Sequence, residues 1–308
     1  MSVALWSSEA WLTAVVGWID RRLAELGRER RGAVTQPHLR PWATVLRIPT
    51  DDGPLWFKAG STGTAFEAAL YETLARVTPE RILVPLAVAA ARGWVLLPDG
   101  GPPLAETATG EARLEGLAAA LVRYGELQRE LAPYAGELLA AGVADMRPAT
   151  MPRRFAEALE ATRPDGPPAA LELWERIAAR GETVRDWCAQ LAGSPLPASL
   201  DHNDLHPWNV LGGERFYDWG DSVLAHPFAV ALVPLAFFDD PAPARDAYLR
   251  GFGDPAELAP TLELACRVAK VARALIWDRA LRASREQGEP IEARFEHAAL
   301  ETLAGVLD

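Results

Sequence analysis

The sequence has few cysteines, no long uninterrupted apolar segment and a deficit of positive charge. Its two cysteines, Cys188 and Cys266, lie far apart without metal-ligand spacing around them, which predicts reduced core residues in a cytoplasmic protein. The longest uncharged run, residues 222–238, contains prolines and falls short of the roughly 20 apolar residues that cross a bilayer. We therefore expect a buried helix there, and no membrane partner.

Charge and composition narrow the class of protein further. The formal net charge is −11, and nucleic-acid binding depends on basic contacts to phosphates, so no nucleic-acid partner is expected. The same charge favours a cationic substrate if the acidic groups gather at a binding site. With 308 residues, 49% apolar and 24% charged, the chain has the composition of a soluble globular protein large enough for two lobes. The N-terminus lacks the basic start of a signal peptide.

The residues that suit a chemical role are concentrated in Leu200–Asp221, where Asp204, Asn209 and Asp218 occur. Transfer of a γ-phosphoryl group requires one group to orient the attacking hydroxyl and oxygen ligands to hold Mg²⁺ at the phosphates. Asp204 suits the first task, and Asn209 and Asp218 suit the second. A zinc site at His202 and His206 is a weaker alternative, because the metalloprotease helix signature requires a Glu after the first His.

A short hairpin is predicted between the two proposed metal ligands. Residues 209–211 and 215–217 read as apolar strands, and Gly212-Gly213 between them is typical of a tight turn. This hairpin folds Asp218 back beside Asn209.

The motifs at residues 204–209 and 218–221 resemble the catalytic loop and metal-binding motif of the aminoglycoside phosphotransferase family. The usual family form has glycine before the catalytic Asp and before the Asn, whereas this chain has Asn203 and Trp208. Neither change removes a proposed ligand. The resemblance implies an α+β, bilobal, protein-kinase-like fold, with an N-terminal antiparallel sheet lobe and a larger, mainly helical C-terminal lobe.

The same resemblance implies a small-molecule kinase. Asp204 is then the catalytic residue, Asn209 and Asp218 are the Mg²⁺ ligands, and ATP or GTP is the phosphoryl donor. The acceptor is expected to be a hydroxyl of a small polar molecule, such as an amino sugar, an aminoglycoside or an amino alcohol. A nucleotide-binding scaffold without useful turnover, similar to a pseudokinase, is the alternative.

The order of predicted elements agrees with two lobes. Strands are predicted at residues 33–36, 42–49, 55–59, 82–90 and 93–97, and helices at 8–30, 66–75, 111–130, 152–161, 169–191, 255–286 and 291–307. The Pro- and Gly-rich segment 98–103 reads as a hinge. We therefore predict a nucleotide-binding lobe over residues 1–97 and a catalytic and substrate-binding lobe over 98–308.

A second set of candidate residues lies in the first predicted lobe. Lys58, one of very few lysines, is placed on a strand where it suits a contact to the nucleotide phosphates. Glu67, in the first turn of the next helix, is the preferred carboxylate partner, with Glu72 as the competitor. Pro98 and Asp99, at the start of the hinge, are the remaining nucleotide-binding candidates.

Two features of protein kinases are absent from the sequence. The segment 36–41 contains no glycine, so it cannot form a Gly-rich phosphate loop. The segment after residue 221 runs almost directly into apolar sequence, which leaves no room for an activation segment that would bind a polypeptide. A small-molecule acceptor is therefore expected.

Overall fold

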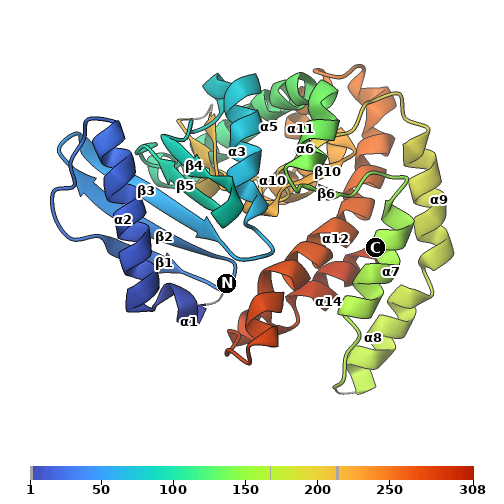
Figure 1. The fold of residues 1–308 in the computed structure, drawn as a ribbon. Coiled ribbons are helices and arrows are strands. Elements are labelled where there is room, and N and C mark those ends of the chain that lie inside the picture. The colour runs from blue at the N-terminus through green and yellow to red at the C-terminus, as the bar shows by residue number, and fades with distance from the viewer. Residues whose placement is uncertain (1–2, 167, 213–214) are drawn as a thin grey trace. The chain divides into compact units, whose positions relative to one another are not determined.

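The structure, a computed structural model, describes residues 3–166, 168–212 and 215–308, which fold as two units (Figure 1). The first unit comprises Met1–Gly101 and Arg279–Ile291, and the second comprises Pro102–Asp278 and Glu292–Asp308. Across the described ranges, no helix combines the length and the low polarity that a membrane crossing requires.

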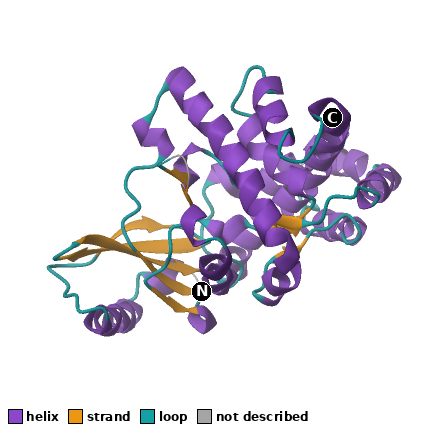
Figure 2. Cartoon of the chain, turned by 90° about the horizontal axis from the view of Figure 1, so that it is seen from above, coloured by secondary structure: helices purple, strands orange, loops and turns teal. Residues whose placement is uncertain are grey.

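The first unit is built on a five-stranded sheet in which neighbouring strands are antiparallel and follow the order β1-β2-β3-β5-β4. Figure 2 shows strands in orange and helices in purple. The strands are β1 (Thr35–Leu39), β2 (Ala43–Thr50), β3 (Gly53–Gly60), β4 (Ala87–Ala89) and β5 (Trp94–Leu97). The helices of this unit are α1 (Val3–Trp6), α2 (Glu9–Glu25) and α3 (Phe66–Val77).

Helix α2 packs across one face of this sheet (Figure 1). It begins at Glu9 because the side chain of Ser8 caps it by accepting a hydrogen bond from the Trp11 amide. Its apolar stripe is buried against the sheet, and the rings of Trp11 and Trp18 meet Phe57 edge-on at centroid distances of 6.3 and 5.8 Å. Each such buried aromatic contributes about 1.5–3 kcal/mol. Because side chains alternate along β3, Lys58 faces away from this core.

One predicted strand of the first unit is wrong over most of its length. Within residues 82–90, Ala87–Ala89 pair with β5, whereas the preceding residues are not in a strand. Pro85 lies within the run and has no amide hydrogen for a sheet ladder, and Pro79–Arg81 before it form a 3₁₀ turn.

The second unit is mainly helical. Its helices are α4 (Leu104–Thr107), α5 (Gly110–Leu131), α6 (Ala135–Ala140), α7 (Met151–Ala161), α8 (Pro168–Ala178), α9 (Gly181–Ala192), α10 (Leu232–Leu235), α11 (Ala242–Leu249), α13 (Ala293–Glu296), α14 (Ala298–Ala304) and α12 (Pro255–Glu286), which continues into the first unit. Two small sheets accompany them. The strands are β6 (Ala144–Asp145), β10 (Val223–Ala225) and β7 (Ser199–Asp201) in one sheet, and β8 (Val210–Leu211) and β9 (Arg215–Phe216) in the other.

Three helix predictions in this unit are also wrong. The predicted helix over residues 291–307 is divided into α13, α14 and a 3₁₀ turn. The predicted helix over residues 169–191 is broken between α8 and α9, and the predicted buried helix over 222–238 is instead a strand, a 3₁₀ turn and the one-turn helix α10. Pro227 begins that 3₁₀ turn, where its missing amide hydrogen costs nothing. The prediction of a helix over residues 255–286 is confirmed by α12.

Candidate active site

The loop that carries Asp204 follows strand β7, which is fixed by helix α5. Gln128 on α5 donates hydrogen bonds to the carbonyls of Leu200 (3.1 Å) and Pro227 (2.8 Å), and it accepts one from the Tyr248 hydroxyl (2.7 Å). Gln128 is buried, so each of these polar groups would lose a partner that water cannot replace if the side chain were removed. The loop therefore starts from a rigid support.

A left-handed residue, Asn203, turns the chain into the loop. Its φ is 60°, and its amide donates to Asp201 Oδ1 at 2.8 Å. Asparagine adopts this region more readily than most residues with a side chain, so Asn203 fills a position where the usual motif has glycine. Asp201 is buried, and burial raises its pKa to about 7.

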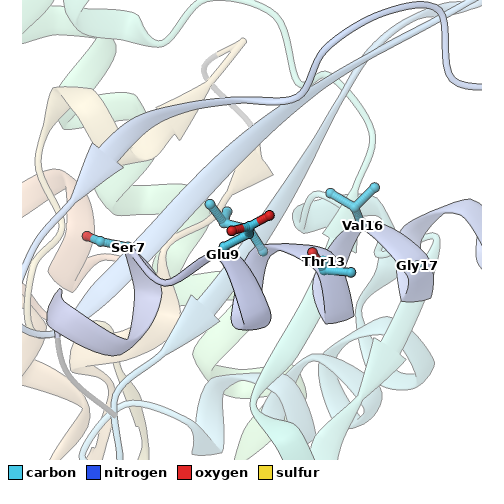
Figure 3. Close-up of a pocket in the computed structure, with 6 residues that line it drawn as sticks. Ser7, Glu9, Thr13, Val16 and Gly17 are labelled. Carbon is cyan, nitrogen blue, oxygen red and sulfur yellow. The ribbon is translucent and has the colours of Figure 1, made fainter.

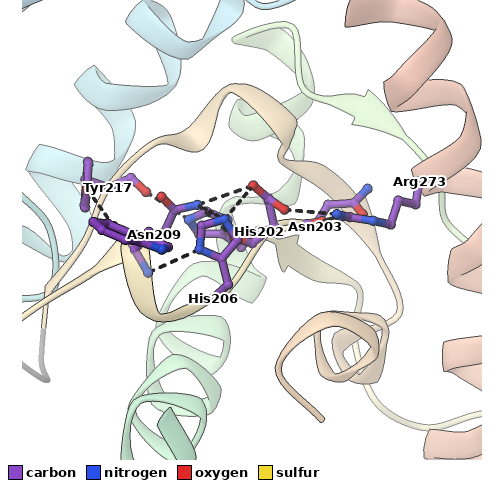
Figure 4. Close-up of polar contacts among 8 residues, drawn as sticks. His202, Asn203, His206, Asn209, Tyr217 and Arg273 are labelled. Atoms are coloured by element: carbon purple, nitrogen blue, oxygen red, sulfur yellow. Dashed lines mark hydrogen bonds and ion pairs between the residues drawn. The ribbon is translucent and has the colours of Figure 1, made fainter. Parts of the chain in front are cut away.

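The carboxylate of Asp204 is held on both of its oxygens (Figure 4). Arg273 Nη2 lies 3.1 Å from Oδ1, and His206 Nε2 lies 3.1 Å from Oδ2. The Asp204 side chain is 26% exposed to solvent. It is therefore oriented by its neighbours and still accessible to a ligand.

Charge around Asp204 keeps it ionised. Burial opposes ionisation, but the hydrogen bond and charge of His206, together with the charge of Arg273, hold the pKa of Asp204 below its ordinary value. For His206, burial lowers the pKa, but the hydrogen bond and charge of Asp204 outweigh it and raise the pKa. The Trp208 amide donates to His206 Nδ1 (3.2 Å), so in the neutral ring the proton is on Nε2 and faces Asp204.

Asn209 is joined to the same loop by a 3₁₀ turn, Pro207–Asn209, that His206 caps. Its side-chain Nδ2 donates to the main-chain oxygen of Asp204 at 2.9 Å, which leaves Oδ1 as the atom available to a cation. Trp208 has a negative φ and so needs no glycine at this position. Its side chain is 54% exposed.

The hairpin predicted after Asn209 is present in the described part of the chain. Strand β8 pairs with β9 in the register Val210 with Phe216 and Leu211 with Arg215. Gly213 of the predicted turn lies outside the described residues. The pairing carries the chain back alongside β8. Asn209 directly precedes β8, and Asp218 follows two residues after the end of β9.

Two hydrogen bonds tie this hairpin to the loop that carries Asp204 (Figure 4). His202 Nε2 donates to the Tyr217 carbonyl at 3.0 Å, and the Tyr217 hydroxyl donates to the Trp208 carbonyl at 2.5 Å. His202 is fully buried against Trp219, and burial lowers its pKa, so the ring is neutral. His202 therefore braces the hairpin against the loop that carries Asp204. Asp218 is exposed, with φ 65°.

The donors at this loop fit Mg²⁺ better than zinc. Asn209 Oδ1 and the exposed Asp218 carboxylate are oxygen donors, and Mg²⁺ keeps several water ligands when few protein ligands hold it. Among the described residues, no three His, Cys, Asp or Glu side chains form a metal-holding group. His206 uses Nδ1 for the Trp208 amide and Nε2 for Asp204, and the fully buried ring of His202 is bonded through Nε2 to the Tyr217 carbonyl.

Lys58 and Glu67 form an ion pair within the first unit. Lys58 Nζ lies 2.8 Å from Oε1 and 2.6 Å from Oε2 of Glu67, and the side chains are 12% and 4% exposed. Lys58 comes from β3 and Glu67 from the first turn of α3, while the competing Glu72 is exposed. A largely buried lysine beside a carboxylate suits the cation of a nucleotide site.

The other two nucleotide-binding candidates follow strand β5. Pro98 is half-buried, and Asp99 is exposed and accepts a hydrogen bond from the Gly101 amide at 3.1 Å. That bond makes an Asx turn, which is the ordinary role of such an aspartate.

A hollow elsewhere on the first unit lies along the first half of α2 (Figure 3). Its lining residues are Ser7, Glu9, Leu12, Thr13, Val16 and Gly17. The lining offers one carboxylate and two hydroxyls without a cation, so it does not suit phosphate binding.

Sequence reasoning did not identify Gln128, Tyr217 or Arg273. For Gln128 a signal existed, because it continues the buried stripe of Leu117, Leu121 and Tyr124 along α5 and a polar residue on such a stripe needs a specific partner. Arg273 had no comparable signal, since its partner lies 69 residues away.

Comparison with known proteins gives one family and several structures. A model of the phosphotransferase enzyme family matches residues 33–261. No curated protein matches the chain.

Solved structures with a similar fold include several phosphotransferases. The macrolide 2'-phosphotransferase MphH from Brachybacterium faecium is 18% identical, with 93% of this chain and 97% of that chain covered and a TM-score of 0.59. The GDP and kanamycin complex of APH(2")-IIIa is 12% identical, with 94% and 97% covered and a TM-score of 0.62. Ethanolamine kinase from Plasmodium vivax is 11% identical, with 97% and 89% covered and a TM-score of 0.57. At these identities the likeness shows the fold, and it confirms the predicted α+β, protein-kinase-like class.

Proposed function

Because the chain belongs to the phosphotransferase enzyme family and is a small-molecule kinase, we propose that it moves the γ-phosphoryl group of ATP or GTP to a hydroxyl of a small polar acceptor. In this proposal residues 1–97 form the nucleotide-binding lobe, and residues 98–308 form the catalytic and acceptor-binding lobe. The protein acts in the cytoplasm.

The observation that carries the proposal is the arrangement of Asp204. Its carboxylate is ionised, fixed on both oxygens and still 26% exposed, and the Asn209 amide is bonded to its main chain. A carboxylate in this state suits a group that accepts a hydrogen bond from an attacking hydroxyl and orients the oxygen toward phosphorus. The charges of His206 and Arg273 keep this carboxylate ionised, so it can take the proton that the acceptor hydroxyl loses.

The remaining residues divide between the phosphates and the metal. Lys58, held by Glu67, contacts the phosphates of the nucleotide, and Pro98 and Asp99 contact its base or sugar. Asn209 Oδ1 and the Asp218 carboxylate would hold Mg²⁺, which would neutralise charge on the phosphates. As the oxygen of the acceptor bonds to phosphorus, the bond from the γ-phosphorus to the nucleoside diphosphate breaks, and ADP or GDP leaves.

Charge and an exposed aromatic side chain indicate the chemical class of the acceptor. The net charge of −11 and the exposed indole of Trp208, one residue before Asn209, support an acceptor with an amine or a sugar ring, since indole faces attract both. The relatives named above supply a test set, because their names include a macrolide, an aminoglycoside and ethanolamine. GTP is tested with ATP because one of those structures is a GDP complex.

The experiment measures release of ADP and GDP with Mg²⁺ and a panel of aminoglycosides, macrolides, amino sugars and amino alcohols. We expect acceptor-dependent release, phosphorylated product by mass spectrometry and loss of both when EDTA removes the metal. Nucleotide binding by calorimetry without turnover on any acceptor would instead support the scaffold that lacks catalysis. The Asp204→Asn variant is the matched control for contaminating kinases.

A further inference from the structure

Arg273 is a charged residue in a helix whose neighbours are mostly apolar. It lies on α12, between the buried residues Ala272 and Ala274, and its side chain is 24% exposed. Its Nη1 donates to the carbonyl of Asn203, and its Nη2 donates to Asp204 Oδ1 at 3.1 Å (Figure 4). The guanidinium therefore contacts both the turn that precedes Asp204 and the carboxylate itself.

We propose that Arg273 is a positioning residue for the phosphoryl transfer. It fixes the Asp204 carboxylate so that one lone pair faces the acceptor hydroxyl. This inference rests on the proposed function. Arg273 and His206 hold opposite oxygens of the carboxylate, so its rotation about the last side-chain bond is blocked from both sides. Each carboxylate oxygen has about two acceptor sites, so both oxygens keep capacity for the substrate.

The geometry of the contact calls for an arginine in particular. One planar group reaches a main-chain oxygen and a carboxylate oxygen with two separate nitrogen atoms, which a single ammonium on a shorter stem cannot match. The Asn203 turn itself is already held by Asp201. The distinct task that remains for Arg273 is the orientation of the carboxylate.

The proposal is tested by steady-state kinetics of Arg273→Met, Arg273→Lys and Arg273→Ala with an acceptor that the wild-type enzyme uses. We expect Arg273→Met to lower kcat by about 10²-fold, the cost of a misplaced catalytic group, while KM for the nucleotide changes by less than about twofold. Arg273→Lys should recover part of the loss. Arg267→Met, on the same helix but exposed and stacked on Trp187, is the matched control and should behave as wild type.

Added guanidinium ion provides the sharper measurement. At concentrations far below those that unfold proteins, it should restore turnover of Arg273→Ala in a saturable way, whereas sodium at equal ionic strength should not. It should not restore Arg273→Ala combined with Asp204→Asn. Unchanged or raised kcat in Arg273→Met, or a loss expressed mainly in the nucleotide KM, would overturn the proposal.

A second measurement does not depend on turnover. Urea midpoints are compared for Arg273→Met, Asp204→Asn and the double variant. If the pair exists, Arg273→Met should lower the midpoint less in the Asp204→Asn background than in the wild-type background; equal shifts would overturn the contact. If the wild-type enzyme phosphorylates no acceptor, the proposed function is wrong, and so is the role of Arg273 in turnover. The urea measurements would in that case still show whether Arg273 and Asp204 interact.

Discussion

The ion pair of Lys58 and Glu67 gives a prediction whose size follows from its burial. Glu67→Gln removes the negative charge beside a lysine that is 12% exposed and held at 2.6–2.8 Å. Breaking a buried ion pair by removing one partner costs about 3–5 kcal/mol. Because glutamine keeps one acceptor oxygen and Lys58 keeps some contact with water, we expect a loss of about 2–3 kcal/mol in the free energy of unfolding.

The assay is urea denaturation without nucleotide, followed by nucleotide titration of the folded variants. Lys58→Met should weaken nucleotide binding by roughly tenfold to a hundredfold, because a hydrogen bond to a charged group contributes about 1.5–3 kcal/mol. Glu67→Gln should weaken it less, because the carboxylate only orients the lysine. Glu72→Gln, on the exposed side of the same helix, is the control. The reasoning is refuted if Glu67→Gln unfolds at the wild-type urea concentration, or if Lys58→Met binds nucleotide as tightly as wild type.

Three further predictions follow from other parts of the structure. Asp218→Ala should abolish Mg²⁺-dependent turnover in a folded protein, checked by product release and circular dichroism; full turnover would remove Asp218 from the metal site. Trp208→Ala should raise KM for the acceptor several-fold while the nucleotide KM stays constant, and Trp208→Phe should recover most of it. Burial lowers the pKa of His226 to about 4, so its ring is neutral in the native state while the unfolded chain takes up a proton below its ordinary pKa of about 6.5. About 3 kcal/mol of stability is therefore lost as pH falls from 6.5 to 4. The variant His226→Asn can still accept a hydrogen bond from the Phe228 amide, and its urea midpoint should depend less on pH over that window.

Local patterns were sufficient for much of the fold and the candidate site. The hairpin after Asn209 follows from short apolar strands and turn residues within a few positions of each other. The Asp204 loop and the pairing of Lys58 with Glu67 were expected from their motifs and element positions together with the family resemblance. The break between α8 and α9 was missed because Ile177, Val184 and Leu191 continue one helical stripe across it.

Contacts between distant segments had no such local signal. Apart from Ser222 and His226, residues 222–238 are apolar, so periodicity could not distinguish the observed strand and 3₁₀ turn from a helix. The bond from Arg273 to Asp204 exists because α12 packs in the same unit as the loop, and that packing depends on side chains spread over the whole unit.

The most direct test of the account is the kinetics and nucleotide affinity of Asp204→Asn, which keeps the size of the side chain and one acceptor oxygen. Since Asp204 is assigned to the acceptor hydroxyl, we expect kcat to fall by about 10²–10⁴-fold while the Kd for the nucleotide with Mg²⁺ stays within about twofold of wild type. A loss of nucleotide binding as severe as that of Asp218→Ala would show that the two roles are wrongly divided. Full phosphoryl transfer by Asp204→Asn would contradict the mechanism.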